Sequence, residues 1–366
     1  MDRLFVINGK FLRVPSTGVH RVAHELANGL AALSAEGHPE VAGMRFELWT
    51  PHDGVERARD IALPLKVIGP LTNIPWEQLT LPLRQQEATL VNLCNIGPML
   101  SRRAVTMIHD VQVHLSPQSY SRGFRAWYHF VQPRFARRHR RILTVSHFSA
   151  DEIARVGLAP ANKIGVIHNG ADHVARVEAD DTILERLRLR HGRYVLALAS
   201  TQAHKNIRVL LEAADRLAAS GLKLVLVGGT NADAFAAAGL RLAPNVRLTG
   251  RISDEQLRAL YEKALCLAFP STTEGFGLPP LEAMTLGCPA LVAPCGALPE
   301  VCGQAADYVD PHAPSAWAAA IERLLKDPSR HAAMAVASRD HAAGFTWRRA
   351  ALQLAQELRH VSDVNR

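Results

Sequence analysis

Short apolar runs alternate along this chain with longer segments in which apolar residues recur at helical spacing. Residues 4–7 (LFVI) form the first run. The segment after Gly18 then carries apolar side chains at helical spacing, namely Val19, Val22, Leu26, Leu30 and Leu33. Buried strands that alternate with amphipathic helices are typical of parallel sheets covered by helices. The pattern therefore predicts the α/β class.

The same alternation restarts near residue 194. We expect strands over residues 194–199, 224–227, 246–248 and 266–269, and a helix that buries Ile207, Leu210, Leu211, Ala214 and Leu217. Residues 253–256 (SDEQ) form a capping box, so another helix begins there. Pro279-Pro280 and Gly287 bracket a short helix in the places that proline and glycine prefer.

This repetition predicts two domains. The length supports the same prediction, because 366 residues exceed the usual size of a domain with one hydrophobic core. Residues 167–181 break the periodicity and become acidic, so we place the hinge there. The prediction is two doubly wound domains facing a cleft, over residues 1–173 and 174–345. Ligands of such sheets bind at the carboxyl ends of strands, which directs attention to the loops at 8–18, 107–112, 199–206 and 270–282.

The amino-acid composition excludes several classes of protein but does not indicate a function. Hydrophobic residues make up 48% and charged residues 21%, which excludes a disordered chain, a collagen and a disulfide-stapled mini-protein. The longest apolar runs are too short to cross a bilayer, and residues 1–7 lack the pattern of a signal peptide. The five cysteines include no CxxC pair, so we expect neither a disulfide framework nor a zinc site, and a reduced, cytoplasmic compartment.

The net charge of +8 is concentrated in the first half of the chain. Residues 101–141 hold nine arginines and one acid, Asp110. Five of these arginines cluster beside Trp127, Tyr128 and Phe130; they are Arg134, Arg137, Arg138, Arg140 and Arg141. One interpretation is a helix that lies on anionic lipid headgroups. A solvated helix face is the alternative, and nucleic acid is a third reading without a binding motif to support it.

Residues 271–282 (STTEGFGLPPLE) carry the most chemical information. The segment runs from a strand end into a helix N-terminus, whose partial positive charge suits a phosphate. Gly275 and Gly277 leave backbone amides open to a ligand. Glu274 and Glu282 could both face a ligand with many hydroxyl groups, because carboxylates accept strong hydrogen bonds. A turn with two solvated glutamates is the plain alternative.

This segment resembles the E-x7-E signature of the family 4 retaining glycosyltransferases. Those enzymes have the GT-B fold of two Rossmann-like domains, with a final helix that crosses back to the first domain. Residues 346–366 would be that helix. The similarity extends over most of the chain, through residues 108–110 (IHD), 143–146 (LTVS), 164–172 (IGVIHNGAD), 195–206 (VLALASTQAHKN), 245–254 (NVRLTGRISD) and 299–301 (PEV).

The resemblance implies roles for individual residues. Lys205 would bind the donor diphosphate, which is sensible for a cation beside a helix start. Glu274 would bind the donor sugar and Glu282 the ribose hydroxyls. The remaining donor-side residues would be Gly18, Ser200, Gly275 and the amides of Phe276, Gly277 and Leu278. His109, after a strand, would lie against the donor sugar.

One departure from the family concerns the residue before Lys205. The family often has an arginine there, whereas this chain has His204, which could donate to phosphate with a charge that depends on pH. Arg251 could supply a permanent second cation from the next loop.

The resemblance also implies a mechanism and a substrate class. No DxD pair is suitably placed, so we expect metal-independent transfer without a cofactor, with a nucleotide-diphosphate sugar as donor. The expected route is front-face attack with retention, and Glu274 as a covalent nucleophile is the rival. At residues 75–78 (PWEQ) and 93–95 (LCN) the chain resembles mannosyl- or rhamnosyltransferases of bacterial surface polysaccharides. From this resemblance we expect mannose from GDP-mannose as the donated sugar. We also expect a lipid-linked oligosaccharide acceptor and a cytoplasmic enzyme at the inner face of the membrane. A sugar-nucleotide epimerase and a non-catalytic scaffold are the alternatives.

Overall fold

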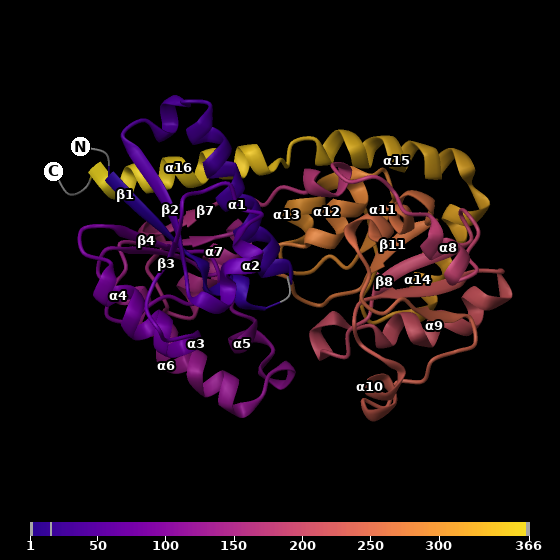
Figure 1. Ribbon diagram of the computed structural model, residues 1–366. Helices are drawn as coiled ribbons and strands as arrows, with labels where there is room; N and C mark the ends of the chain where they lie inside the picture. The colour runs from indigo at the N-terminus through magenta and orange to yellow at the C-terminus, as the bar shows by residue number, and fades with distance from the viewer. Residues whose placement is uncertain (1–2, 15–16, 364–366) are drawn as a thin grey trace. The chain divides into compact units, whose positions relative to one another are not determined.

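The structure is a computed structural model that describes residues 3–14 and 17–363. It divides into two compact units, Met1–Gly170 with Thr346–Arg366, and Ala171–Phe345. Each unit contains one sheet with helices packed against it (Figure 1). The boundary after Gly170 lies inside the segment 167–181 in which the sequence places the hinge. Residues 15–16 of the expected loop 8–18, and 364–366 of the expected last helix, lie outside the described residues.

The first unit is built on a seven-stranded parallel sheet in the order β3-β2-β1-β4-β5-β6-β7. The strand order reverses between β1 and β4, which makes this the switch point where open α/β sheets bind ligands. The strands are β1 (Arg3–Asn8), β2 (Met44–Thr50), β3 (Leu65–Val67), β4 (Thr89–Asn92), β5 (Ala104–Met107), β6 (Arg141–Thr144) and β7 (Ile164–Val166).

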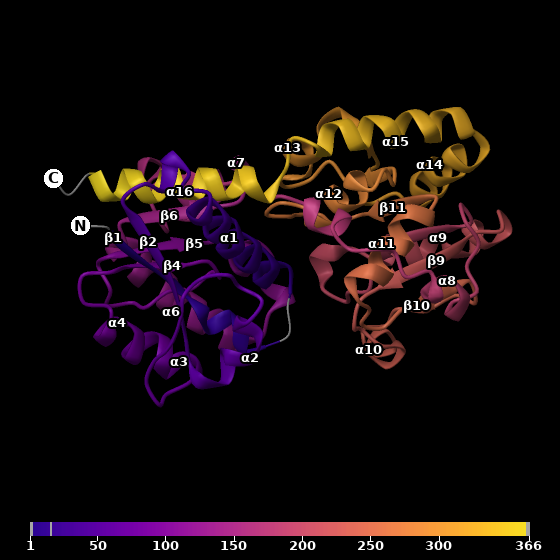
Figure 2. The ribbon, with the colours of Figure 1, turned by 45° about the horizontal axis from the view of Figure 1, so that its top comes forward.

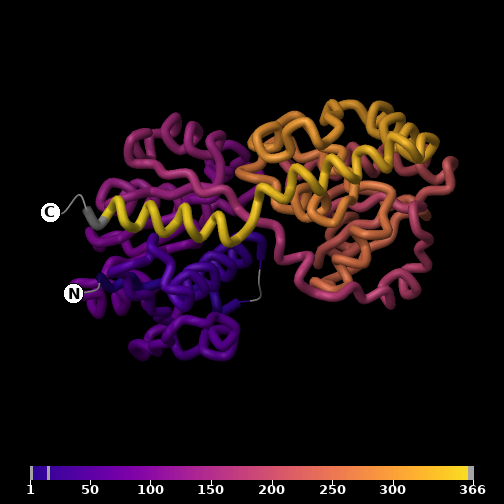
Figure 3. The backbone as a smooth tube through the Cα atoms, turned by 90° about the horizontal axis from the view of Figure 1, so that it is seen from above, coloured from indigo at the N-terminus to yellow at the C-terminus, as the bar shows by residue number. Residues whose placement is uncertain are grey.

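The helices of the first unit include the last helix of the chain. In sequence order they are α1 (Gly18–Ala35), α2 (Val55–Ala58), α3 (Asn73–Pro75), α4 (Leu81–Arg84), α5 (Gln112–Leu115), α6 (Arg122–Arg138), α7 (His147–Arg155) and α16 (Trp347–Asp363). Helix α16 lies beside α1 (Figure 2, Figure 3). The approach is close, because a Cβ on Gly29 would lie 2.5 Å from Cβ of Ala351. Ala350, Leu354 and Leu358 form the buried face of α16.

The second unit repeats the scheme with a six-stranded parallel sheet in the order β10-β9-β8-β11-β12-β13. Its strands are β8 (Tyr194–Leu198), β9 (Lys223–Val227), β10 (Val246–Leu248), β11 (Cys266–Phe269), β12 (Ala290–Val292) and β13 (Asp307–Tyr308). Its helices are α8 (Thr182–Arg186), α9 (Arg208–Ala219), α10 (Ala232–Ala237), α11 (Asp254–Lys263), α12 (Leu278–Thr285), α13 (Leu298–Cys302), α14 (Pro314–Lys326) and α15 (Pro328–Ala342).

The predicted fold class is confirmed: two doubly wound parallel sheets, with the last helix packed on the first unit. The capping box is present as well, since Oγ of Ser253 accepts the amide of Gln256 at the start of α11. The prediction of a single basic helix over residues 133–141 is wrong at its end. Helix α6 ends at Arg138, and Arg141 is the first residue of β6. No helix among residues 3–14 and 17–363 is both long and apolar enough to cross a membrane.

Candidate active site

The candidate site of the second unit lies at the switch point of its sheet. Strands β8 and β11 are neighbours, paired through Val195 and Cys266, and the strand order reverses between them. Because all strands run parallel, the loops that follow β8 and β11 leave the same edge of the sheet. An amide hydrogen bond from Thr272 to the carbonyl oxygen of His204 joins these two loops at 2.8 Å. This is where a doubly wound sheet leaves room for a ligand.

The two loops bring Lys205 and Glu274 together. Nζ of Lys205 lies 2.8 Å from Oε1 and 3.1 Å from Oε2 of Glu274. The side chains are 22% and 12% exposed, so the pair is partly withdrawn from water without being sealed from it. The sequence proposed both residues as site residues but not that they bind each other.

The loop after β8 is held in shape by Asn206, which the sequence did not single out. The 3-10 turn Ala203–Lys205 ends at Asn206 in the left-handed conformation, with φ of 51°. Its side-chain amide donates to the carbonyl oxygens of Pro270 (3.1 Å) and Pro311 (2.7 Å). Asparagine tolerates this conformation better than most residues. Asn206 thereby fixes the direction in which Lys205 leaves the turn.

The start of α12 is shaped by Gly277. This residue has φ of 102°, and a Cβ there would lie 2.5 Å from Cδ2 of Leu298. Pro279 and Pro280 have no amide proton, so Leu278 provides the amide of the first turn that can meet a ligand. The ring of Phe276 is buried and packs edge-on against Phe345. The side chain of Phe276 is thus part of the core, which leaves its backbone for the role that the family suggests.

Glu282 lies one turn further along α12 and is held by two residues that the sequence analysis missed. Nε2 of His173 lies 3.1 Å from Oε1, and the hydroxyl of Tyr261 donates to Oε2 at 3.2 Å. Burial, and then the charge of Glu282, raise the pKa of Tyr261 well above its usual value, so the hydroxyl stays a donor. His173 directly follows a motif that the sequence analysis used, whereas Tyr261 gives no signal beyond an apolar helix position.

His204 does not provide the pH-dependent cation that the sequence allowed. Its side chain is 4% exposed. Burial, and then the ammonium of Lys205, lower the pKa of His204 to about 4. The imidazole is therefore neutral at pH 7. Arg251 stays a prediction for the second cation, and its exposed side chain lies across Gly229, with Nε 3.3 Å from the position of a Cβ there. Gly229 follows β9, next to β8 in the sheet.

The sequence also predicted Ser200, Gly275 and Gly18 as site residues. Oγ of Ser200, after β8, accepts the amide of Gln202 at 3.3 Å, as in a turn. Gly275 lies in the loop between β11 and α12. Gly18 begins α1 in the first unit, and a Cβ there would meet no atom of the described residues within 4 Å. Among the described residues of the first unit, no steric reason therefore requires a glycine at this position.

His109, in the first unit, is held by backbone and side-chain groups around β4 and β5. Nε2 donates to the carbonyl oxygen of Leu93 at 2.8 Å, and the amide of His109 donates to Oδ1 of Asn95 at 2.7 Å. The carbonyl can only accept, so the proton is on Nε2. Burial lowers the pKa of His109 to about 4. His109 is thus a neutral, oriented imidazole.

The five arginines of the basic cluster do not form one surface. Arg141 makes two hydrogen bonds to the carboxylate of Glu357 on α16, at 2.7 and 3.1 Å. The guanidinium of Arg134 lies over the ring of Phe130 at 3.6 Å. Burial, and then Arg103, lower the pKa of Arg140. Arg134, Arg137 and Arg138 are exposed on α6 and remain as the surface-facing arginines, with Arg137 and Arg138 in the last turn.

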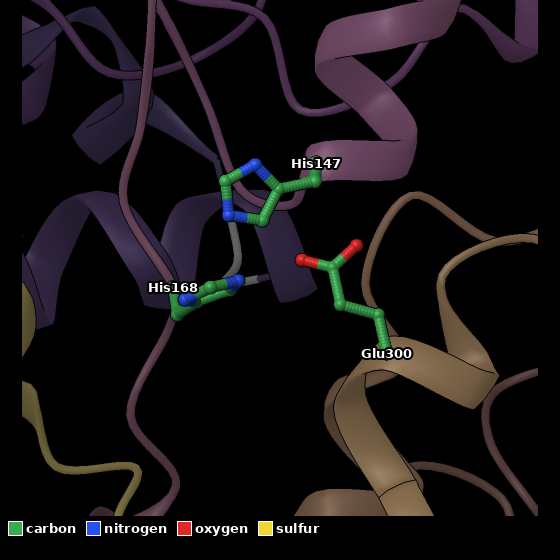
Figure 4. A group of neighbouring side chains, drawn as sticks. All are labelled: His147, His168 and Glu300. Carbon is green, nitrogen blue, oxygen red and sulfur yellow. The ribbon is translucent and has the colours of Figure 1, made fainter.

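Two histidines that were not among the predicted site residues lie close together in the first unit. The rings of His147, at the start of α7, and His168, after β7, have centroids 5.6 Å apart in a T-shaped arrangement (Figure 4). Glu300, also drawn there, belongs to α13 of the second unit. Within either unit alone, the described residues bring together no three histidine, cysteine or carboxylate side chains as a metal site requires.

Comparison with known families matches both halves of the chain. A family model described as Glycosyltransferase Family 4 matches residues 16–174, and one described as Glycosyl transferases group 1 matches residues 181–341. The second match contains Lys205, Glu274 and Glu282. Sucrose-phosphate synthase from Thermosynechococcus elongatus has a similar fold, with a TM-score of 0.72 at 20% identity, and each chain is covered completely.

Curated relatives are similar over part of their length. An O-antigen chain mannosyltransferase B from Escherichia coli is 31% identical, covering 68% of each chain. The O-antigen chain mannosyltransferase RfbU from Salmonella typhimurium is 28% identical, covering 63% of each. A D-inositol 3-phosphate glycosyltransferase from Corynebacterium kroppenstedtii is 30% identical, covering 60% of this chain and 49% of that protein. The chain thus matches less than two thirds of the length of two of these relatives.

Proposed function

The chain belongs to glycosyltransferase family 4, and from this premise we propose that it transfers a hexose from a nucleotide-diphosphate sugar to a saccharide acceptor. The observation that carries the proposal is the Lys205–Glu274 pair at the switch point of the second sheet. Mannose from GDP-mannose is the proposed donor, supported by two relatives that are named O-antigen mannosyltransferases. The proposed acceptor is a lipid-linked oligosaccharide of surface polysaccharide synthesis.

The ion pair suggests how the donor enters. In the absence of donor, the carboxylate of Glu274 neutralises Lys205. A diphosphate that arrives at the N-terminus of α12 offers Lys205 a stronger anionic partner. Glu274 is then released to accept hydrogen bonds from hydroxyl groups of the sugar. Glu282, already oriented by His173 and Tyr261, accepts from the ribose.

We propose that the reaction proceeds with retention and without a metal. The bond from the anomeric carbon to the phosphate oxygen breaks, and negative charge grows on the leaving phosphate. Lys205, Arg251, the loop amides and the end of α12 stabilise that charge. The acceptor oxygen attacks from the same face and gives its proton to the leaving phosphate. His109 is neutral and its Nε2 proton is bonded to Leu93, so its Nδ1 can accept a hydrogen bond from a sugar hydroxyl, and the ring carries no charge.

Peripheral attachment to an anionic membrane surface is the proposed means of reaching a lipid-linked acceptor. Exposed Arg137 and Arg138 would contact the headgroups, since juxtamembrane basic side chains contribute about 1 kcal/mol each. Arg141 is excluded from this role by its pairing with Glu357.

The experiment is thermal denaturation with GDP, GDP-mannose, UDP, UDP-glucose and dTDP sugars. A nucleotide at about 100 times its dissociation constant adds about 2.7 kcal/mol to the free energy of unfolding. Stabilisation by GDP compounds alone supports GDP-mannose as the donor. Stabilisation by UDP or dTDP compounds would reject GDP-mannose as the donor. The sugar nucleotide that binds is then incubated with lipid-linked oligosaccharide, and NMR reports the anomeric configuration of the product. Consumption of donor without acceptor would favour an epimerase.

A further inference from the structure

A small cavity lies at the carboxyl edge of the first sheet, at the switch point between β1 and β4. Its volume is about 200 Å³, below the 300–1,000 Å³ of pockets for drug-sized ligands. The lining includes Asn8, Lys10, Glu77, Cys94 and Tyr128, which all belong to the first unit. The sequence analysis used Glu77 and Cys94 only as members of the segments 75–78 and 93–95, and it gave none of the five residues a binding role. The space suits one small polar ring and not an extended chain.

Glu77 is a nearly buried carboxylate in this cavity, with a side chain that is 2% exposed. Nδ2 of Asn8, the last residue of β1, donates to Oε1 at 3.1 Å. The ammonium of Lys10 pairs with Oε2 at 2.5 Å. Lys10 is 23% exposed, so the pair reaches from the interior to the mouth of the cavity.

The chain around Glu77 is anchored so that the carboxylate keeps its position. Trp76 is fully buried, and its indole Nε1 donates to the carbonyl oxygen of Ile68 at 2.8 Å. Residues Trp76–Thr80 form a π-helical turn, a rare conformation that is frequent at functional sites. Nδ2 of Asn8 also donates to Oδ1 of Asn92 at the end of β4, at 2.9 Å. The carboxylate is thus tied to both strands of the switch point.

Stability alone does not account for this arrangement. Withdrawing a carboxylate and an ammonium from water costs free energy that their attraction often fails to recover, and an apolar pair would serve the core as well. Ionisable groups that are buried in a cavity at a switch point are instead typical of binding sites. We therefore consider which ligand they fit.

The balance of charge in the cavity favours a neutral ligand. Lys10 is paired with Glu77, and Arg13, a second cation of the lining, is paired with Asp53 at 2.6 Å. Burial, and then the charge of Asp110, raises the pKa of Tyr128, so its hydroxyl remains a hydrogen-bond donor. These three groups can all form hydrogen bonds with the hydroxyl groups of a sugar. The carboxylate accepts, the ammonium donates, and the phenol can do either.

We propose that this cavity binds one neutral monosaccharide unit of the acceptor, and that Lys10 and Glu77 recognise two adjacent hydroxyl groups on it. Oε2 of Glu77 accepts from one hydroxyl, and Nζ of Lys10 donates to the oxygen of the next. This inference rests on the proposed function, since it concerns the acceptor of the same reaction. It makes Glu77 and Lys10 determinants of acceptor specificity.

The test is saturation-transfer NMR of the full chain with the methyl α-glycosides of mannose, galactose, glucose and rhamnose. We expect at least one glycoside to bind. Glu77→Gln and Lys10→Met each weaken that binding about tenfold, the factor that corresponds to about 1.4 kcal/mol. Glu87→Gln is the matched control, because Glu87 is an exposed carboxylate of the same unit. Inorganic pyrophosphate is added as a competing anion.

Three results would overturn the inference: no glycoside binds the unaltered chain, both variants bind as well as the control, or pyrophosphate displaces the glycoside. Thermal stabilisation by nucleotides is measured on the same samples. If both variants keep it, they are folded and the second unit is intact. If nucleotides bind normally and the substitutions at residues 10 and 77 leave glycoside binding unchanged, this inference alone is rejected. If no nucleotide stabilises the unaltered chain, the proposed function is rejected.

Discussion

Nζ of Lys205 lies 2.8 Å from Oε1 of Glu274, although 69 residues separate them along the chain. The contact exists because β8 and β11, which precede the two residues, are neighbours at the point where the strand order reverses. A cation and an anion of the predicted donor site therefore pair with each other, and we propose that a ligand replaces one partner.

Replacing Tyr261 with phenylalanine should weaken nucleotide binding. The substitution removes the hydroxyl that donates to Oε2 of Glu282 and leaves the ring in place. We expect the dissociation constant for the nucleotide to rise about tenfold or more, since a hydrogen bond to a charged group contributes about 1.5 kcal/mol or more. Isothermal titration calorimetry measures the change. Tyr308→Phe is the control, because the hydroxyl of Tyr308 donates to the carbonyl oxygen of Gly303 and not to Glu282. An equal loss of nucleotide affinity in the two variants would contradict the role of Tyr261.

Alanine at Gly277 should destabilise the second unit. The residue has φ of 102°, and the added Cβ would lie 2.5 Å from Cδ2 of Leu298. Backbone strain of this kind costs about 1–3 kcal/mol. Chemical denaturation of Gly277→Ala should show that loss, while Gly18→Ala, which meets no described atom, should leave stability unchanged within about 0.5 kcal/mol. An unaffected Gly277→Ala variant would show that the loop before α12 can relax.

Stability should fall when the pH drops from about 6.5 toward 4, and His204 should contribute. Burial and Lys205 lower the pKa of the folded imidazole to about 4, while the unfolded one has its ordinary value of 6.5. Between these values the unfolded chain binds a proton that the folded chain does not, so acid favours unfolding by up to about 1.4 kcal/mol per pH unit for this group. Denaturation across this range should show a smaller slope for His204→Gln. An unchanged slope, equal to that of the exposed-site variant His312→Gln, would contradict the burial of His204.

Substitutions at two sets of arginines, the pair Arg137 and Arg138 and the single residue Arg141, should separate membrane binding from folding. Arg137→Gln with Arg138→Gln should reduce sedimentation with phosphatidylglycerol vesicles and leave stability unchanged, because both side chains are exposed. Arg141→Gln should instead cost about 1–3 kcal/mol of stability, because it leaves Glu357 without its bidentate partner. Neutral phosphatidylcholine vesicles are the control. Equal sedimentation of the double variant and the unaltered chain at low salt would reject the membrane surface.

Periodicity predicted the elements whose apolar positions face a core. Leu210, Ala214 and Leu217 are buried on α9, and the strand run 266–269 is β11 as expected. The end of α6 was not predictable in the same way. Consecutive arginines carry no periodic signal, so nothing local separates the last turn of α6 from Arg141, which starts β6.

The site was predicted as a set of residues but not as a set of contacts. The E-x7-E spacing identified Glu274 and Glu282, yet their partners come from distant segments. Tyr261 is on another helix, and the loop that carries Lys205 follows another strand. The neutrality of His204 likewise depends on burial by the folded chain, which the sequence does not display.

The most direct test of the donor site is calorimetric titration of GDP-mannose into the unaltered chain and into Lys205→Ala. Lys326→Ala, an exposed lysine of the same unit, is the control. The account predicts that the unaltered chain and the control bind alike and that Lys205→Ala binds at least tenfold more weakly, because a charge-assisted contact to the diphosphate is lost. Equal affinity in all three proteins would contradict the assignment of Lys205, and with it the claim that the switch point of the second sheet holds the donor.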